Sequence, residues 1–85
     1  MEWDETKSAR NLELRGFGFE IAYEFDWDNA VTERDDRKDY GETRFRAFGR
    51  ADEINLVIAF TVRNREVRII SIRRMNRREA RRYDF

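Results

Sequence analysis

The sequence predicts an α+β domain in which two helices precede an antiparallel sheet of about four strands and one helix follows it. Helix start and stop signals gather at the two ends of the chain, whereas alternating and β-branched segments joined by short turns fill its second half. Elements segregated in this way are typical of α+β folds. The 85 residues are 40% apolar and 14% aromatic, which is enough for one core. We therefore expect a single domain over residues 1–85.

Two helices are predicted in the first third of the chain. Asp4 is a good N-cap for a helix over Glu5–Arg15, and Gly16 is a good residue to end it. Aromatic and small apolar residues then recur at three- and four-residue spacing, which predicts a second, short helix over Glu20–Asp26. A polar, acidic stretch follows, in which we expect an exposed loop through residues 35–39.

The remaining elements are strands and a closing helix. The strand segments either alternate between apolar and polar residues or are rich in Val, Ile, Phe and Thr. The last two strand segments are separated by a turn short enough to form a β-hairpin. Asn76 begins the final helix, because Glu79 three residues later completes a capping box. The predicted strands are one beginning near Ala30, then Arg44–Arg50, Asn55–Arg63 and Val67–Arg73.

Alternation along the strands predicts one core face and one arginine-rich face. If Phe45 and Ala47 face the core, six apolar residues of the later strands continue that face: Leu56, Ile58, Phe60, Val62, Ile70 and Ile72. This register also puts Arg68 on the core side. The opposite face then carries arginines separated by small residues, namely Arg44, Arg46, Ala59, Thr61, Arg63, Ser71 and Arg73. Such a face has room for a large anionic ligand.

The formal net charge of zero conceals a segregation of charge. Residues 1–62 carry a net charge of −6, residues 63–85 carry +6, and all nine basic residues of the second segment are arginines. Because guanidinium is planar and always charged, it pairs with phosphate or carboxylate through two hydrogen bonds. An arginine-only basic end therefore favours phosphate or carboxylate recognition. The alternative is that the arginines of the last helix only solvate its outer surface.

Several classes of site are excluded by composition. The chain has no Cys and no His. It therefore has no disulfide, no thiol nucleophile and no imidazole base, and it cannot hold zinc through Cys and His ligands. Its longest apolar run, Leu56–Phe60, is far below the roughly 20 residues that cross a bilayer, and its acidic start does not resemble a signal peptide. We expect a cytoplasmic protein with no cofactor and no membrane contact. A metal site formed by Asp35, Asp36 and Asp39 has no further support.

Short motifs occur in a fixed order along nearly the whole chain. The first is Trp3-Asp4-x-x-Lys7-x-x-x-Asn11-Leu12, followed by Gly16 and Phe19-Glu20-x-Ala22. Gly41-Glu42-x-Arg44 and Gly49 lie in the middle, and Arg68-Ile69-Ile70-Ser71-x-Arg73 leads to Arg78-Glu79-x-x-x-Tyr83. In order and spacing these motifs resemble the BrnT family of small ribonuclease toxins. Members of that family commonly read Lys-His-Gly after the first helix, where this chain reads Leu14-Arg15-Gly16.

The resemblance implies a type II toxin with a RelE-like fold. It implies an endoribonuclease that inhibits translation, an RNA substrate, and a BrnA-like antitoxin as the partner that neutralises it. Operator DNA would be contacted only through that antitoxin, which carries the DNA-binding element.

RNA cleavage without a metal ion requires deprotonation of the 2′-hydroxyl, stabilisation of the phosphorane charge and protonation of the 5′-oxygen. We expect Arg44, Arg73 and Arg77 to supply positive charge to the reaction. Because the chain has no His, Glu42 and Lys7 are the candidates for proton transfer, and Tyr83 is a candidate to position or donate a proton. The expected RNA-binding residues are Arg46, which could also stabilise charge, Arg63, Arg68 and Arg74.

Each candidate also has a structural interpretation. Arg68 could pair with Glu20 or Glu24, Glu79 could serve only as a helix cap, and Tyr83 could pack against the sheet. The rival functional class is a non-enzymatic binding module, in which the same arginines bind an acidic protein segment or a nucleic acid without cleaving it.

Overall fold

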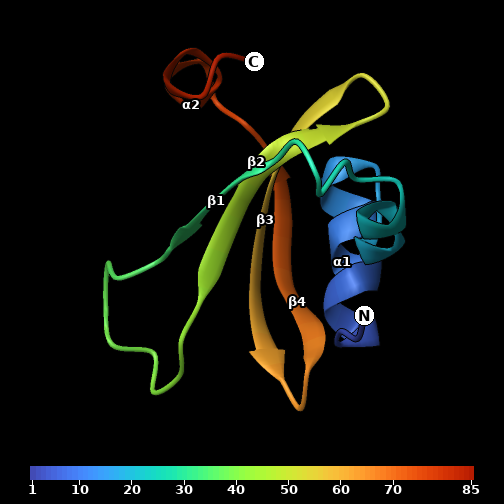
Figure 1. Ribbon diagram of the computed structural model, residues 1–85. Helices are drawn as coiled ribbons and strands as arrows, with labels where there is room; N and C mark the ends of the chain where they lie inside the picture. The colour runs from blue at the N-terminus through green and yellow to red at the C-terminus, as the bar shows by residue number, and fades with distance from the viewer.

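Four antiparallel strands form a single sheet in the order β1-β2-β3-β4, so that each strand pairs with the one before it in the chain (Figure 1). The computed structural model describes residues 1–85. Helices α1 and η1 lie on one side of the sheet. Helix α2 lies apart from them, beyond one end of the sheet and near the C-terminus. The elements are α1 (Glu5–Arg15), η1 (Phe19–Tyr23), β1 (Val31–Arg34), β2 (Phe45–Ala51), β3 (Ile54–Arg63), β4 (Glu66–Arg74) and α2 (Arg77–Arg82).

The predicted α+β class, the four strands and the two terminal helices are confirmed. The side chain of Asp4 caps α1 by accepting from the backbone N–H groups of Thr6 and Lys7. Gly16 ends this helix with a φ of 87°, a left-handed conformation that glycine adopts without steric cost. Neither α-helix has the length and apolar character that crossing a membrane requires.

The predicted second α-helix is wrong. Residues Phe19–Tyr23 form a five-residue 3-10 helix, so the chain has two α-helices and not three. The hydrogen bonds from Ile21 N to Gly18 O and from Glu24 N to Ile21 O each span three residues. The segment is held at both ends, because Phe19 N donates to the Ser8 hydroxyl and Phe25 forms a β-bridge with Ala51. Too few residues remain between these anchors for the costly nucleation of an α-helix.

The face of the sheet that meets α1 and η1 carries the hydrophobic core. Phe45 pairs with Phe60 and Ala47 with Ile58, and Ile58 pairs in turn with Ile72, so the predicted core register holds across the middle of the sheet. Phe19 and Ile21 of η1 and Phe25 beyond it pack into the same cluster. The aromatic rings of this segment therefore replace the second helix as the cover of the core.

A β-bulge between Ala59 and Phe60 corrects the predicted register of β4. Ala59 pairs with Ser71, but Phe60 pairs with Ile69, which leaves Ile70 without a partner. The extra residue reverses which face of the sheet each side chain of β4 points to on one side of the bulge. Ile69 is therefore buried in the core in place of Ile70, and Arg68 moves to the opposite face. Val62, predicted to face the core, lies beyond it and is exposed.

The buried polar residues of α1 provide a test of this packing. The Nδ2 of Asn11 donates to the carbonyl of Phe17 at 2.9 Å, in a buried position. We expect Asn11→Ala to lower the free energy of unfolding by about 1–3 kcal/mol, because that carbonyl would be left unpaired away from water. Glu13→Ala, an exposed change on the same helix, should have almost no effect. Urea denaturation of the three proteins measures the difference, and equal stabilities would contradict this role for Asn11.

Candidate nucleic-acid interface

Four arginines lie on the face of the sheet opposite the core. The register pairs Arg46 with Ala59, Arg68 with Thr61 and Arg73 with Val57, and residues paired in this way point to the same side of a sheet. The small side chains of Ala59 and Ser71 lie between these arginines. We call this surface the arginine face and define it as Arg46, Arg63, Arg68 and Arg73.

Every arginine of this face is paired with a carboxylate, and the four carboxylates come from four different segments. The partners lie in the N-terminal segment, in β1, in the loop between β1 and β2, and in α2. The N–O distances are 3.4 Å for Arg68–Glu2, 3.1 Å for Arg46–Glu33, 2.7 Å for Arg63–Glu42 and 2.7 Å for Arg73–Glu79. Arg68 thus pairs with neither Glu20 nor Glu24. Each guanidinium of the arginine face therefore already holds a carboxylate of the chain itself.

The Arg73–Glu79 pair attaches α2 to the sheet. Two parallel hydrogen bonds of 2.7 and 2.8 Å join the guanidinium to both carboxylate oxygens, and Asn76 N also donates to Glu79 in the capping box. The Arg73 hydrogen bonds, together with that of Asn76, lower the pKa of Glu79 to about 2. Glu79 is therefore both the predicted helix cap and the ligand of Arg73.

Tyr83 closes the same end of the face. Its ring stacks on that of Phe48 with centroids 4.0 Å apart, and the guanidinium of Arg46 lies 5.3 Å from the Phe48 centroid. Burial and the nearby carboxylate of Glu33 raise the pKa of Tyr83, so the phenol keeps its proton at neutral pH. The structure thus gathers two guanidinium groups, two carboxylates and a phenol at one end of the arginine face.

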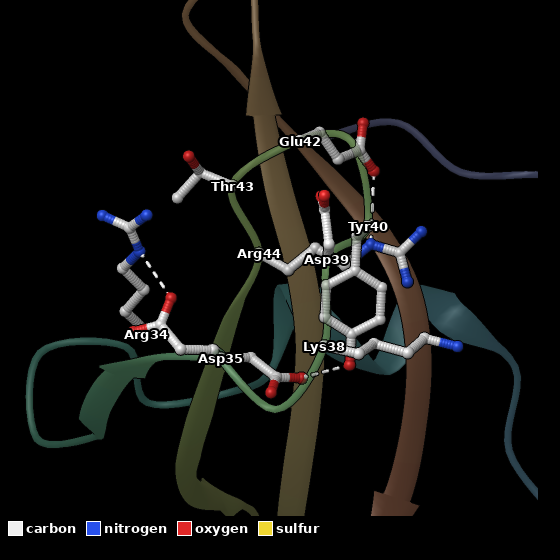
Figure 2. A pocket seen from close by; sticks show the side chains of 9 residues that line it. Arg34, Asp35, Lys38, Asp39, Tyr40, Glu42, Thr43 and Arg44 are labelled. Carbon is white, nitrogen blue, oxygen red and sulfur yellow. Dashed lines mark hydrogen bonds and ion pairs between the residues drawn. The ribbon is translucent and has the colours of Figure 1, made fainter.

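The loop between β1 and β2 forms a pocket of about 330 Å³ beside this face (Figure 2). Asp35, predicted to lie in an exposed loop, is only 6% exposed. Its carboxylate accepts two hydrogen bonds of 2.8 Å from the guanidinium of Arg37 and one of 3.1 Å from the hydroxyl of Tyr40. These donors compensate its burial and hold its pKa well below the usual range. The loop therefore folds around Asp35.

Glu42 and Arg44 belong to this loop rather than to the cluster around Arg73. Glu42 accepts from Arg63 at 2.7 Å and from Arg44 at 3.3 Å, and these hydrogen bonds, the first the stronger, lower its pKa. The guanidinium of Arg44 lies 4.2 Å from the centroid of the Tyr40 ring. This geometry favours a structural ion pair for Glu42, because a carboxylate stabilised in this way is a weak proton acceptor.

The other predicted site residues are dispersed. Lys7 lines a separate hollow between α1 and β4. Arg74 turns toward α1, where it donates to the carbonyl of Arg15 at 3.0 Å and lies over the ring of Phe17. Arg77 is exposed at the first position of α2. Of the predicted set, the structure brings together Arg46, Arg73 and Tyr83.

Sequence reasoning missed Glu33, whose carboxylate pairs with Arg46 at 3.1 Å. The pairing of β1 with β2 places these two residues opposite each other, but the sequence had predicted only where β1 begins. No cluster of three or more acidic side chains has a geometry that would hold a metal ion.

A family model described as "Ribonuclease toxin, BrnT, of type II toxin-antitoxin system" matches residues 3–79. The chain belongs to the BrnT family. The matched region contains the whole arginine face and Glu79 but ends before Tyr83. Membership supports a ribonuclease toxin at the level of the family, with an antitoxin partner and an RNA substrate in general. No curated protein and no solved structure matches the chain, so the RelE-like fold stays a prediction.

The lowered pKa of Glu79 predicts how the docking of α2 depends on pH. A carboxyl with a depressed pKa stabilises the docked state above its ordinary pKa of 4.5, and this contribution is lost as the pH falls toward about 2. We expect the backbone amide NMR signals of Asn76 and the first turn of α2 to report the loss of this attachment between these pH values. In Glu79→Gln this transition should be absent, whereas Glu53→Gln, an exposed change, should retain it. A midpoint at the pKa of an ordinary carboxyl would contradict the Arg73–Glu79 pair.

Proposed function

We propose that this BrnT-family chain is an endoribonuclease that cleaves single-stranded RNA without a metal ion and thereby inhibits translation in the cytoplasm. A BrnA-like antitoxin would neutralise it and would be its only link to operator DNA. The observation that carries the proposal is the meeting of Arg46, Arg73 and Tyr83 at one end of the arginine face. Two guanidinium groups, each paired with a carboxylate, lie there with a protonated phenol.

These groups supply the three functions that the reaction needs. Glu33, the carboxylate that pairs with Arg46, would accept the proton of the 2′-hydroxyl. The 2′-oxygen then bonds to phosphorus, and Arg46 and Arg73 stabilise the negative charge of the phosphorane. As the bond from phosphorus to the 5′-oxygen breaks, Tyr83 gives its proton to that oxygen. The products are a 2′,3′-cyclic phosphate and a free 5′-hydroxyl.

RNA binding would require an exchange of anions at Arg73. Glu79 occupies both hydrogen-bonding positions of the guanidinium edge, which a phosphate oxygen pair would also use. A phosphate that replaces Glu79 releases α2 from one of its attachments, and the stack of Tyr83 on Phe48 still holds the other. In this proposal α2 keeps the tyrosine over the site while the substrate takes the cation.

Arg73→Ala tests this assignment. Loss of a cation aimed at the transition state removes about 2–4 kcal/mol of stabilisation, by analogy with an oxyanion donor. At about 1.4 kcal/mol per factor of ten, RNA cleavage should slow about a hundredfold or more. Arg78→Ala, an exposed change on α2, should cleave at the rate of the wild type.

Glu79→Gln separates catalysis from the docking of α2. This change breaks the ion pair but leaves Arg73 in place, so cleavage should be retained or enhanced. If Glu79→Gln loses as much activity as Arg73→Ala, the pair is structural and Arg73 does not act on the substrate.

Metal independence is tested with purified protein and single-stranded RNA in the presence of EDTA. We expect cleavage to continue and the product to carry a 2′,3′-cyclic phosphate, because the proposed groups need no metal ion to stabilise the phosphorane. Complete inhibition by EDTA that magnesium reverses would overturn the mechanism.

A non-enzymatic binding module is the second candidate. The observation that favours it is the absence of His, because the imidazole that most often transfers protons in catalysis is missing. In the same assay, saturable RNA binding with no cleavage product would favour the binding module over the nuclease.

A further inference from the structure

Helix α1 has its polar and apolar residues on unexpected sides. Its two buried residues are polar, Ser8 at 4% and Asn11 at 8% exposure, whereas Leu12 and Leu14 are 53% and 74% exposed. A helix that covers a core normally buries its apolar side chains. The fold explains the buried pair, because Ser8 and Asn11 bind the backbone at Phe19 and Phe17. It does not explain the exposed leucines.

Leu14 borders a hollow of about 280 Å³ between α1 and β4, which we call the α1–β4 groove. Its apolar lining comes from Leu14, Phe19 and Ile70, and its charged lining consists of Lys7, Arg10 and Arg15. No acidic residue lines the groove, and none of these three cations forms an ion pair. The positive charges of the α1–β4 groove are thus not paired with carboxylates, whereas those of the arginine face are.

The edge of β4 gives the α1–β4 groove a second feature. β4 is the last strand of the sheet, and α1 runs beside it (Figure 1). The chain's own Glu2 pairs with this edge in parallel, since Glu2 N donates to Val67 O and Ile69 N donates to Glu2 O, both at 2.9 Å. No strand pairs with the outer edge of β4 beyond Ile69, which is where Ile70 and Ser71 line the groove. The edge therefore already accepts added backbone and is left open at the groove.

We propose that the α1–β4 groove binds an extended acidic segment of a partner protein in which apolar residues separate the carboxylates. The carboxylates would pair with Lys7, Arg10 and Arg15, the apolar side chains would contact Leu14 and Ile70, and the backbone would add to the edge of β4. RNA fits this groove less well. Its only aromatic lining residue, Phe19, is 2% exposed and offers no surface on which a base could stack. This binding goes beyond the RNA-cleaving site and does not depend on cleavage.

The test uses two synthetic octapeptides, one alternating Glu and Leu and one alternating Lys and Leu, and an eight-nucleotide oligouridine. Each is titrated into the isotope-labelled protein while the backbone amide signals are followed by NMR. The Glu–Leu peptide should bind saturably and shift the signals of Ile70, Ser71 and the residues of α1. The Lys–Leu peptide should not bind, because it places like charges together in the groove.

Charge reversal at the groove identifies the cations. Lys7→Glu combined with Arg10→Glu should weaken binding of the Glu–Leu peptide by about tenfold or more, since each change replaces an attraction with a repulsion. The matched control is Arg65→Glu, an exposed arginine in the turn between β3 and β4. Leu14→Ser tests the apolar half of the groove without a change of charge and should also weaken binding.

Three outcomes would overturn the proposal. The first is no binding of the Glu–Leu peptide, and the second is an affinity that charge reversal in the folded variant leaves unchanged. The third is binding of oligouridine to the groove in competition with the peptide, which would identify a nucleic acid as the occupant. Peptide binding remains measurable whether or not the protein cleaves RNA, so failure here is distinct from failure of the nuclease proposal.

Discussion

The β-bulge between Ala59 and Phe60 determines which side chains of β4 reach each side of the sheet. One unpaired residue sends Ile69 into the core and moves Arg68 onto the arginine face. It also leaves Ile70 at the edge, where it lines the α1–β4 groove. Because strand alternation has a period of two, a single extra residue reverses every position beyond it. The position of Arg68 on the arginine face and the position of Ile70 in the proposed docking groove therefore both depend on this irregularity.

Ion pairs then decide how the charges of the two surfaces are used. On the arginine face, each guanidinium is paired with a carboxylate from another segment of the chain. An incoming phosphate must compete with these carboxylates, so affinity depends on exchange rather than on uncompensated positive charge. The cations of the α1–β4 groove have no such competitors, which makes this groove the more direct site for an acidic partner. In the two proposals, RNA and a partner protein would therefore be bound through separate sets of cations.

Helix α2 links the chemistry of the site to the stability of the fold. It buries no residue of its own, and its attachments to the sheet are the Arg73–Glu79 pair and the stack of Tyr83 on Phe48. An element held by so few contacts opens at low free-energy cost. Substitution of either Arg73 or Glu79 removes the ion-pair attachment of α2, but only substitution of Arg73 also removes a cation of the site, so a comparison of the two variants distinguishes these effects.

The sequence by itself determined the elements whose signals are local. Asp4 and Gly16 delimit α1, Asn76 and Glu79 begin α2, and the alternation around Phe45 and Ile58 identifies the core face. Local patterns, because they report only neighbouring residues, could not reveal the two-ended anchoring that makes residues 19–23 a 3-10 helix, nor the bulge that moves Arg68. Only the tertiary structure decided that Glu33 meets Arg46 and that Asp35 is buried. Contacts between distant segments depend on strand register and loop closure, which no short stretch of sequence encodes.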